Sequence, residues 1–345
     1  MASTSDVSTT SISIDDILQQ LSVGITPTRS AIYDALRSLQ APNDIQYRLR
    51  VVLLNDGTIL SLPMYEYVDH YYFIILLKCL RYNTSIVHLK IYAAMDDDVM
   101  KEFSTMLGHN HYIKKIHIIR HPITRQSEKY LVEALKINTS LTELFISSLQ
   151  DDPNDMNNHF FIEDILEYLK LNTTIVILSL AIYNLSEINI NHICNILIRN
   201  NTLERLYLGY CNINVDDVNR IISCLKYNTN LRALDLSDNK SNIDTINVIA
   251  DVLKYNNTIN IIFIDFVYDP SDVIDHQLID DNTRDDIEKY NDAINNLSQS
   301  VYQNISIRYL HGIELTNKIM KVLHRNIDNS NIRYQQLLNV LLESL

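Results

Sequence analysis

Glycine and proline are scarce in this sequence, with 5 and 6 residues among 345, and tryptophan is absent. So few turn-forming residues leave little material for tight hairpins or flexible linkers. Five glycines also argue against a glycine-rich phosphate-binding loop, and the sequence contains no GxxxxGK, GxGxxG, HExxH or GxSxG motif. We therefore expect a protein that is not an enzyme and that carries no cofactor.

The sequence also lacks the usual signals of export and of disulfide chemistry. Its beginning, MASTSDVSTTSISIDD, has no basic segment followed by an apolar one. The longest apolar runs, such as Tyr71–Leu77, are far shorter than the ~20 residues that span a bilayer. The four cysteines show no CxxC spacing, which argues against a zinc site and a disulfide framework. These absences predict an intracellular, cytoplasmic protein that binds neither a metal nor a membrane.

The charge is strongly negative, at -13, whereas nucleic-acid-binding proteins usually show a basic stripe. We interpret the local group of Lys114, Lys115 and Arg120 as solvated surface charge and expect no nucleic-acid partner. Asparagine, isoleucine and tyrosine are abundant, which is typical of AT-rich genomes such as those of protists or giant viruses. For a viral protein the expected location is the host cytoplasm.

An internal repeat is the strongest feature of the sequence. The phrase LKYNTNLRALDL and its variants recur, and the spacings between successive asparagines are 27, 28, 34, 28, 28, 28 and 48 residues. A period of 28 with two insertions predicts stacked units of one supersecondary structure. The asparagines that mark the units are Asn83, Asn110, Asn138, Asn172, Asn200, Asn228, Asn256 and Asn304.

Spacing within the repeat predicts the structure of each half. Counted from each asparagine, positions -7, -3, +3, +6 and +8 hold a large apolar residue in 39 of 40 cases, Gly312 being the exception. Positions -7 and -3 share one face of a helix, whereas +6 and +8 alternate as in a strand that is buried on one face. We expect the asparagine to end the helix because it tolerates a left-handed cap conformation and bonds nearby backbone. Stacked units then form a parallel sheet covered by helices.

This unit resembles the leucine-rich repeat of the ribonuclease-inhibitor type, whose pattern is LxxLxLxx(N/C)xL followed by a helix. Residues 203–213 match every marked position, with Cys211 at the Asn/Cys position. Leu231, Leu234, Leu236 and Asn239 match again, whereas His121 and Tyr183 depart from the pattern. The resemblance covers residues 83–326 and implies an α/β horseshoe of about 8–9 repeats, with its parallel sheet on the concave face and its helices on the convex face.

The ends of the chain are less regular. We expect residues 1–11 to be disordered, because they are rich in serine and threonine and almost uncharged. Residues 12–82 are expected to contain two short helices and a capping unit, and residues 327–345 a closing helix over the last apolar layer. The repeats themselves are assigned to residues 83–326.

Alternation in the strands places positions +5 and +7 on the concave face. Exposed aromatic and arginine side chains on a rigid sheet are typical interface anchors. We therefore predict that the chain binds a protein partner in this groove; its oligomeric state is left open. The predicted partner-binding residues are Phe145, Tyr207, Phe263, Arg205, His117, Asp235, Lys90 and Tyr309.

Two insertions follow strands, at SSLQDDPNDMNNHF and at residues 265–286, and the second holds eight aspartates against one arginine. Such a loop rim could steer a basic partner, or it could be only a solvated loop. Calcium-loop spacing is missing. As a regulatory alternative, the stretch LKINTSLTELFISS resembles the repeats of tropomodulins, which cap actin filaments. Proteins that activate the Ran GTPase share the repeat class, and IDDILQQL is faintly similar to an F-box helix.

Overall fold

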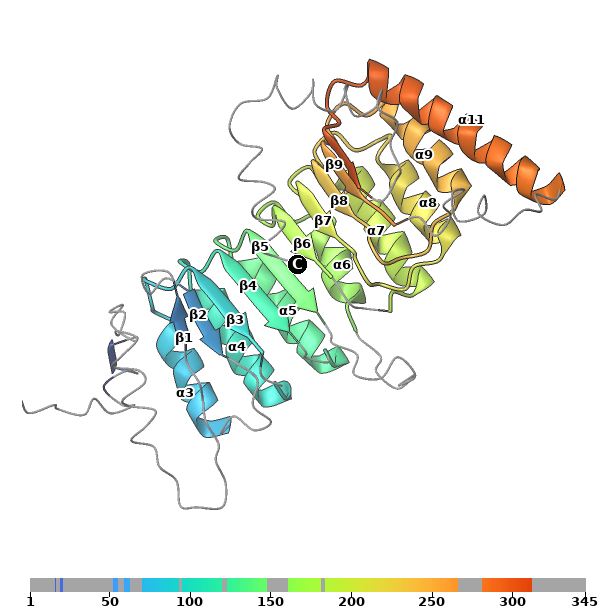
Figure 1. Cartoon of the computed structure of the whole chain (residues 1–345). Helices are drawn as coiled ribbons and strands as arrows, with labels where there is room; N and C mark the ends of the chain where they lie inside the picture. Colours follow the sequence, from blue (N-terminus) through green and yellow to red (C-terminus); the bar gives the residue numbers. More distant parts are fainter. Residues whose placement is uncertain are drawn as a thin grey trace, which may run out of the picture. The chain divides into compact units, whose positions relative to one another are not determined.

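The computed structural model describes residues 52–54, 59–62, 70–92, 95–119, 123–147, 161–180, 184–265 and 281–311, together with positions 16, 19 and 20. The chain divides into two compact units, residues 1–165 and 166–345. Each unit has strands on one side and helices on the other (Figure 1).

Unit 1 begins with an antiparallel pair, β1 (Val52–Leu54) and β2 (Ile59–Leu62). From β2 onward the strands are parallel: β2 pairs with β3, β3 with β4, and β4 with β5. Helices alternate with these strands, and the helix α6 reaches the boundary of the unit. The remaining elements are α3 (His70–Leu80), β3 (His88–Ile91), α4 (Asp97–His109), β4 (Lys115–Ile119), α5 (Arg125–Ile137), β5 (Glu143–Ser147) and α6 (Glu163–Leu169).

Unit 2 repeats the same alternation. Its strands pair in parallel in sequence order, β6 with β7, β7 with β8, β8 with β9 and β9 with β10. The longest helix, α11, packs on α9. The elements are β6 (Ile177–Ser179), α7 (Glu187–Arg199), β7 (Arg205–Tyr207), α8 (Val215–Cys224), β8 (Ala233–Asp235), α9 (Ile243–Leu253), β9 (Ile261–Phe263), α11 (Asp281–Gln303) and β10 (Tyr309–His311).

The apolar repeat positions form the core between the two layers. All 39 large apolar residues at positions -7, -3, +3, +6 and +8 are buried, and none exceeds 5% exposure. Burying such side chains supplies about 25 cal/mol per Å² of apolar surface, which makes this layer the main favourable contribution to folding. The predicted α/β repeat architecture, with parallel strands on one side and helices on the other, is confirmed.

Several expectations lie outside the described residues. They concern disorder in 1–11, the short helices between 14 and 40, the closing helix of 327–345 and most of both insertions. The expected capping unit includes β1, β2 and α3, and its antiparallel β1 is the one departure from the parallel order among the described strands. The domain limits at residues 82 and 326 stay predictions.

The repeat asparagine uses its whole side chain, as Asn256 shows. Its Oδ1 accepts hydrogen bonds from the backbone N–H groups of Thr258 (2.9 Å) and Ile259 (2.8 Å). Its Nδ2 donates to the carbonyls of Leu225 (2.7 Å) and Asn228 (2.9 Å) in the preceding repeat. One buried amide therefore connects the start of the following strand, β9, to the end of α8, the helix of the preceding repeat.

The same bonds recur along both units, and we call them the asparagine ladder. Oδ1 accepts from the N–H groups at +2 and +3 in every repeat, at 2.6–3.0 Å. The amides of Asn110, Asn138, Asn200, Asn228, Asn256 and Asn304 donate to carbonyls of the preceding repeat at 2.7–3.0 Å. Asn172 instead donates to Tyr168 Oη and Thr174 Oγ1.

The conformation expected for these asparagines is wrong. Asn110, Asn138 and Asn200 cap their helices with extended backbone, at φ between -82° and -72° and ψ near 124–125°, and not in the left-handed region. Five residues, bent just after the asparagine, join each of these helices to the next strand, and the asparagine side chain, rather than a left-handed turn, satisfies the backbone groups at the junction.

Loss of a ladder amide should be one of the largest single-residue effects in the chain. Asn256→Ala leaves two carbonyls and two N–H groups buried without these partners, so we expect the free energy of unfolding to fall by about 3–5 kcal/mol. Urea denaturation measures the change. The neighbouring Asn257 is exposed, and Asn257→Ala is the matched control, expected to stay within ~0.5 kcal/mol of wild type. Equal effects of the two substitutions would contradict the ladder.

Candidate functional site

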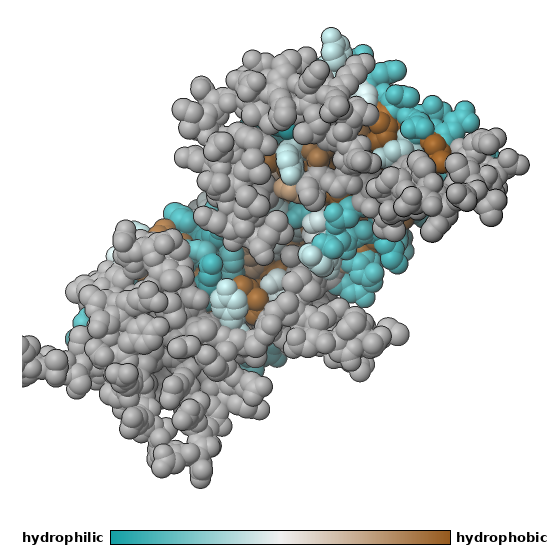
Figure 2. Space-filling model, viewed as in Figure 1, coloured by the Kyte–Doolittle hydropathy of each residue, from teal (hydrophilic) through white to brown (hydrophobic). Residues whose placement is uncertain are grey.

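In each unit the strand side chains at positions +5 and +7 point away from the helices, and we call the surface that they form in either unit its open face. Burial alternates along β3 and β4, with +6 and +8 buried and +5 and +7 half-buried. Figure 2 shows hydrophobic residues in small patches among hydrophilic ones on the side of the molecule that Figure 1 presents. The alternation predicted for the strands is thus confirmed in β3 and β4, whereas all three residues of β6 and of β8 are buried.

In unit 1 the open face carries an aromatic and basic cluster. The rings of His117 and Phe145 lie on adjacent strands with centroids 4.1 Å apart. The Lys115 ammonium lies 4.7 Å from the Phe145 centroid and 3.2 Å from a carboxylate oxygen of Glu143. These contacts fix the side chains in a defined arrangement, because each partner restricts the rotamers of the other.

Two neutral histidines stand side by side in this cluster. The ring centroids of His88 and His117 are 4.8 Å apart. Burial, with the nearby lysines, lowers the pKa of His88 to about 3; burial, with His88 and the lysines, lowers that of His117 to about 2. Among the described residues, neither Nε2 atom has a hydrogen-bond partner, although both are buried. Such groups are rare in folded proteins and mark positions where a binding partner can supply the missing bond.

In unit 2 the open face is more apolar around one arginine. Arg205 lies between Ile177 and Ala233 on the neighbouring strands, and its buried Nε has no acceptor among the described residues. The rings of Phe263 and Tyr309 meet at a centroid distance of 5.5 Å. Arg205 on β7 and this ring pair on β9 and β10 belong to the same sheet of unit 2 but are separated by β8. Arginine and aromatic residues are both enriched at protein interfaces.

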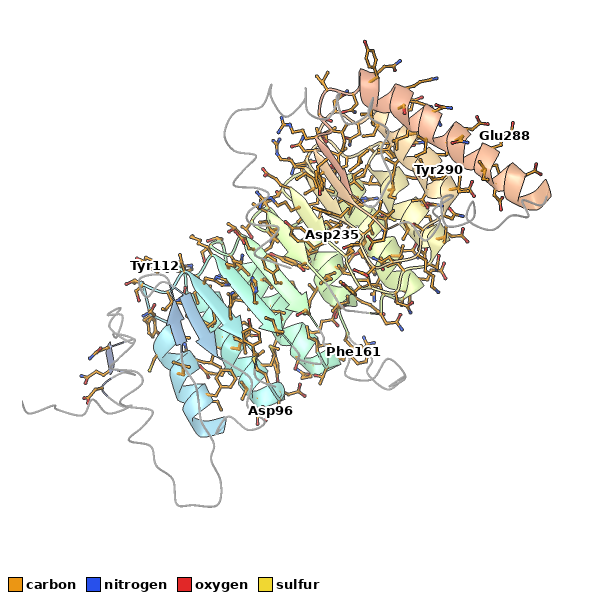
Figure 3. All side chains as sticks on the ribbon, in the orientation of Figure 1. Asp96, Tyr112, Phe161, Asp235, Glu288 and Tyr290 are labelled. Atoms are coloured by element: carbon orange, nitrogen blue, oxygen red, sulfur yellow. The ribbon has the colours of Figure 1, made fainter. Side chains whose placement is uncertain are left out.

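Asp235 is the acidic residue of this surface. Its Oδ1 accepts hydrogen bonds from the backbone N–H and the hydroxyl of Ser237, at 2.9 and 2.5 Å. Burial raises the pKa of its carboxyl group above the ordinary value, while the two bonds from Ser237 oppose that rise. Figure 3 labels Asp235 on the strand side of unit 2.

The structure divides the predicted binding residues between the units. Lys90, His117 and Phe145 belong to unit 1, and Arg205, Tyr207, Asp235, Phe263 and Tyr309 to unit 2. Phe145, Tyr207 and Asp235 are 9%, 6% and 9% exposed, so they contribute little accessible area, whereas the other five are half-buried. His88 and Lys115 were absent from the predicted set, although the period-two alternation of their strands indicates that they share this face.

The loops after β7 and β8 carry a second set of repeat-to-repeat bonds. Asn239 Oδ1 accepts from the N–H groups of Cys211 (3.2 Å) and Ile213 (2.9 Å), and its Nδ2 donates to the carbonyl of Leu208 (2.7 Å). The thiol of Cys211 contacts the carbonyl of Leu180 at 3.1 Å. The residues at the Asn/Cys position of these two repeats thus bond backbone groups of the preceding repeat.

The chain has a leucine-rich-repeat fold of the ribonuclease-inhibitor type.

No protein-family model matches the chain, and no curated protein matches it in sequence. Solved leucine-rich-repeat structures are similar at low identity. An actin-binding site 2 structure of leiomodin-1 is 16% identical, with 54% of this chain and 98% of that one covered and a TM-score of 0.38. The tropomodulin C-terminal domain of Caenorhabditis elegans is 14% identical, with 51% of this chain and 98% of that one covered and a TM-score of 0.39. The leucine-rich-repeat protein LegL7 of Legionella pneumophila is 12% identical, with 80% of this chain and 82% of that one covered and a TM-score of 0.48. None of these values transfers a partner or an activity to this chain.

The described leucine-rich repeats contain few groups suited to metal, disulfide or membrane chemistry. No group of three or more His, Cys, Asp or Glu side chains is placed to hold a metal ion. Cys79, Cys194, Cys211 and Cys224 are all free thiols. No described helix is long and apolar enough to cross a bilayer.

The buried histidines predict a loss of stability in acid. In the unfolded chain their pKa is about 6.5, so below that pH the unfolded state binds more protons than the folded state. The free energy of unfolding should therefore fall as the pH drops from 6.5 towards 3. His117→Phe keeps the stacking on Phe145 and removes one proton site, so its stability should fall less between pH 7 and pH 5.

Chemical denaturation at the two pH values measures this difference. His111→Phe, at an exposed histidine, is the control. An acid dependence of His117→Phe identical to that of wild type would contradict the neutral, buried state of His117.

Proposed function

We propose that the protein is a non-catalytic interaction module that binds a protein partner through the open face. The observation that carries the proposal is the set of buried polar atoms that lack partners there: Nε2 of His88, Nε2 of His117 and Nε of Arg205. A buried polar atom without a hydrogen bond costs about 1–3 kcal/mol, which a partner recovers when it supplies the bond. A regular sheet holds these atoms in place, so binding orders few side chains.

The chemistry of the face favours a polypeptide. Aromatic rings, an arginine and lysines alternate with small or aliphatic residues, the mixture that protein interfaces use at their centres. Unit 1 contributes positive charge at Lys90 and Lys115, and unit 2 contributes Arg205 next to apolar strand residues. The predicted steering of a basic partner by residues 265–286 lies mostly outside the described residues and stays a prediction, as does a regulatory role.

Charge reversal on the open face should weaken binding without unfolding the chain. Arg205→Glu and Lys90→Glu change half-buried residues of the predicted set, one in each unit. We expect each to weaken the affinity for the captured partner at least ~10-fold, equivalent to 1.4 kcal/mol. The measurement is affinity capture with quantitative mass spectrometry, followed by titration of the purified partner.

Matched controls make the same charge change on the helical side of each unit, where Lys101 and Arg220 are exposed. Lys101→Glu and Arg220→Glu should capture the partner as wild type does. If the open-face variants are folded by circular dichroism and still bind with the wild-type affinity, the open face is not the binding site.

A further inference from the structure

Exposed apolar side chains gather at one edge of each unit. We call it the asparagine edge: the residues from three before to four after each repeat asparagine, where helices end and strands begin. Among the described residues, 12 large apolar side chains are exposed. Two of them, Ile188 and Tyr210, lie outside these segments, and Val87 is the last residue of the Asn83 segment. The other nine lie within two residues of an asparagine: Tyr82, Tyr112, Ile137, Leu171, Ile198, Tyr227, Tyr255, Tyr302 and Ile305, at 47–77% exposure.

The same edge is basic in an otherwise acidic chain. Its eight segments hold nine lysines and arginines but a single carboxylate, Glu204, whereas the whole chain has 29 basic and 42 acidic residues. The edge therefore carries a formal charge of 9 - 1 = +8, and the rest of the chain carries -21. Six of the nine cations form ion pairs, with Glu102, Glu133, Glu167, Glu204 and Asp251, the last of which is shared by Lys226 and Lys254. These pairs compensate part of the positive charge and leave part of it uncompensated.

The opposite edge, where strands end and helices begin, is acidic. Figure 3 labels Tyr112 and Asp96, which lie at the two different edges of unit 1. In unit 2 this acidic edge also exposes apolar residues, Ile188 at 53% and Tyr210 at 58%. Carboxylates occupy the first turn of every helix from α4 to α9: Asp97, Asp98, Glu128, Glu163, Asp164, Glu187, Asp216, Asp217 and Asp244.

Helix dipoles account for part of this pattern but not for all of it. A dipole favours cations at the last turn and anions at the first turn of each helix. It gives no reason to expose tyrosine, leucine and isoleucine beside the cations at 60–77%, as at Leu171, Tyr227, Tyr255 and Tyr302. Exposed apolar rows that lie among charges of one sign are typical of interaction surfaces.

We propose that the asparagine edge of unit 2 docks on the acidic edge of unit 2 in a second copy of this chain. Each edge presents apolar side chains next to charges of one sign, and the signs are opposite, so the two surfaces complement each other. The asparagine ladder holds the basic edge rigid, since it joins the residues next to Tyr227 and Tyr255 to neighbouring repeats. The contact joins two different surfaces, so it generates a ring or an open chain of copies. This inference does not depend on the open face.

Sedimentation velocity over a concentration series tests the proposal with the full chain. We expect the average mass to rise with concentration at ~0.05 M salt and to fall back at ~0.5 M, where charges are screened within a few Å. The basic-edge variant is Arg199→Glu, Tyr227→Ser and Tyr255→Ser. The acidic-edge variant is Glu187→Lys, Ile188→Ser and Asp216→Lys. All six residues are exposed, so the variants should keep the wild-type unfolding midpoint.

Each variant alone should be monomeric, with self-association at least ~10-fold weaker than in wild type. An equimolar mixture of the two should form a dimer and nothing larger, because only one intact edge of each kind remains. The control, Glu288→Lys with Lys289→Glu on the exposed side of α11, should associate as wild type does.

A wild-type protein that stays monomeric at ~100 μM would overturn the proposal, since a specific contact of even ~10–100 μM affinity is visible there. So would wild-type association that survives both edge variants, or two folded monomeric variants whose mixture forms no dimer. Capture of the open-face partner should be unchanged in both variants, which separates a failure here from a failure of the proposed function.

Discussion

In six repeats, the buried amide of the asparagine connects the helix end of the preceding repeat to the strand start of its own repeat. The last carbonyls of a helix have no hydrogen-bond donor within the helix. The buried N–H groups just before the next strand likewise need a hydrogen-bond acceptor. Asparagine supplies two donors and one acceptor on a short stem, so a single side chain serves both groups. The ladder also tolerates insertions. Asn304 bonds the carbonyls of Leu253 and Asn256 even though its repeat is 20 residues longer than the period.

This constraint orders the rest of the molecule. Because each described helix from α3 onward ends within four residues of a repeat asparagine and the next strand begins five residues after it, the helix C-termini of each unit lie on one of its edges and the N-termini on the other. Cations and exposed tyrosines then collect on the first edge and carboxylates on the second. One face of the strands packs against the helices, and the other is the open face. In unit 1 the open face brings together His88, His117 and Phe145. The proposed partner surfaces are consequences of the repeat.

The sequence predicts the core well because a core obeys a simple rule of spacing. Apolar residues at fixed distances from each asparagine identify helix, strand and buried side, and those positions are buried in the structure. The role of asparagine was anticipated only in part: its bonds to local backbone were expected, but the bonds of Asn256 to residues 28 and 31 positions earlier depend on stacking. Alternation places Tyr207 on the open face, yet its exposure of 6% follows from neighbours that spacing does not specify. The two charged edges emerge only when distant segments are brought side by side.

The central claim is that the repeat is a modular unit of 28 residues closed by its asparagine. Removing residues 201–228 deletes one full period and brings Asn200 in front of Thr229, so the ladder can re-form across the junction. Removing 201–226 deletes two residues fewer and leaves the surplus at the helix end, so that Arg199 and Asn195 stand at the apolar positions -3 and -7 of Asn228. The insertions that the ladder tolerates lie instead between strand and helix. Far-UV circular dichroism with urea denaturation should show cooperative unfolding for the first deletion and its loss for the second. Equal behaviour of the two shortened chains, whether both fold or both fail, would contradict the account.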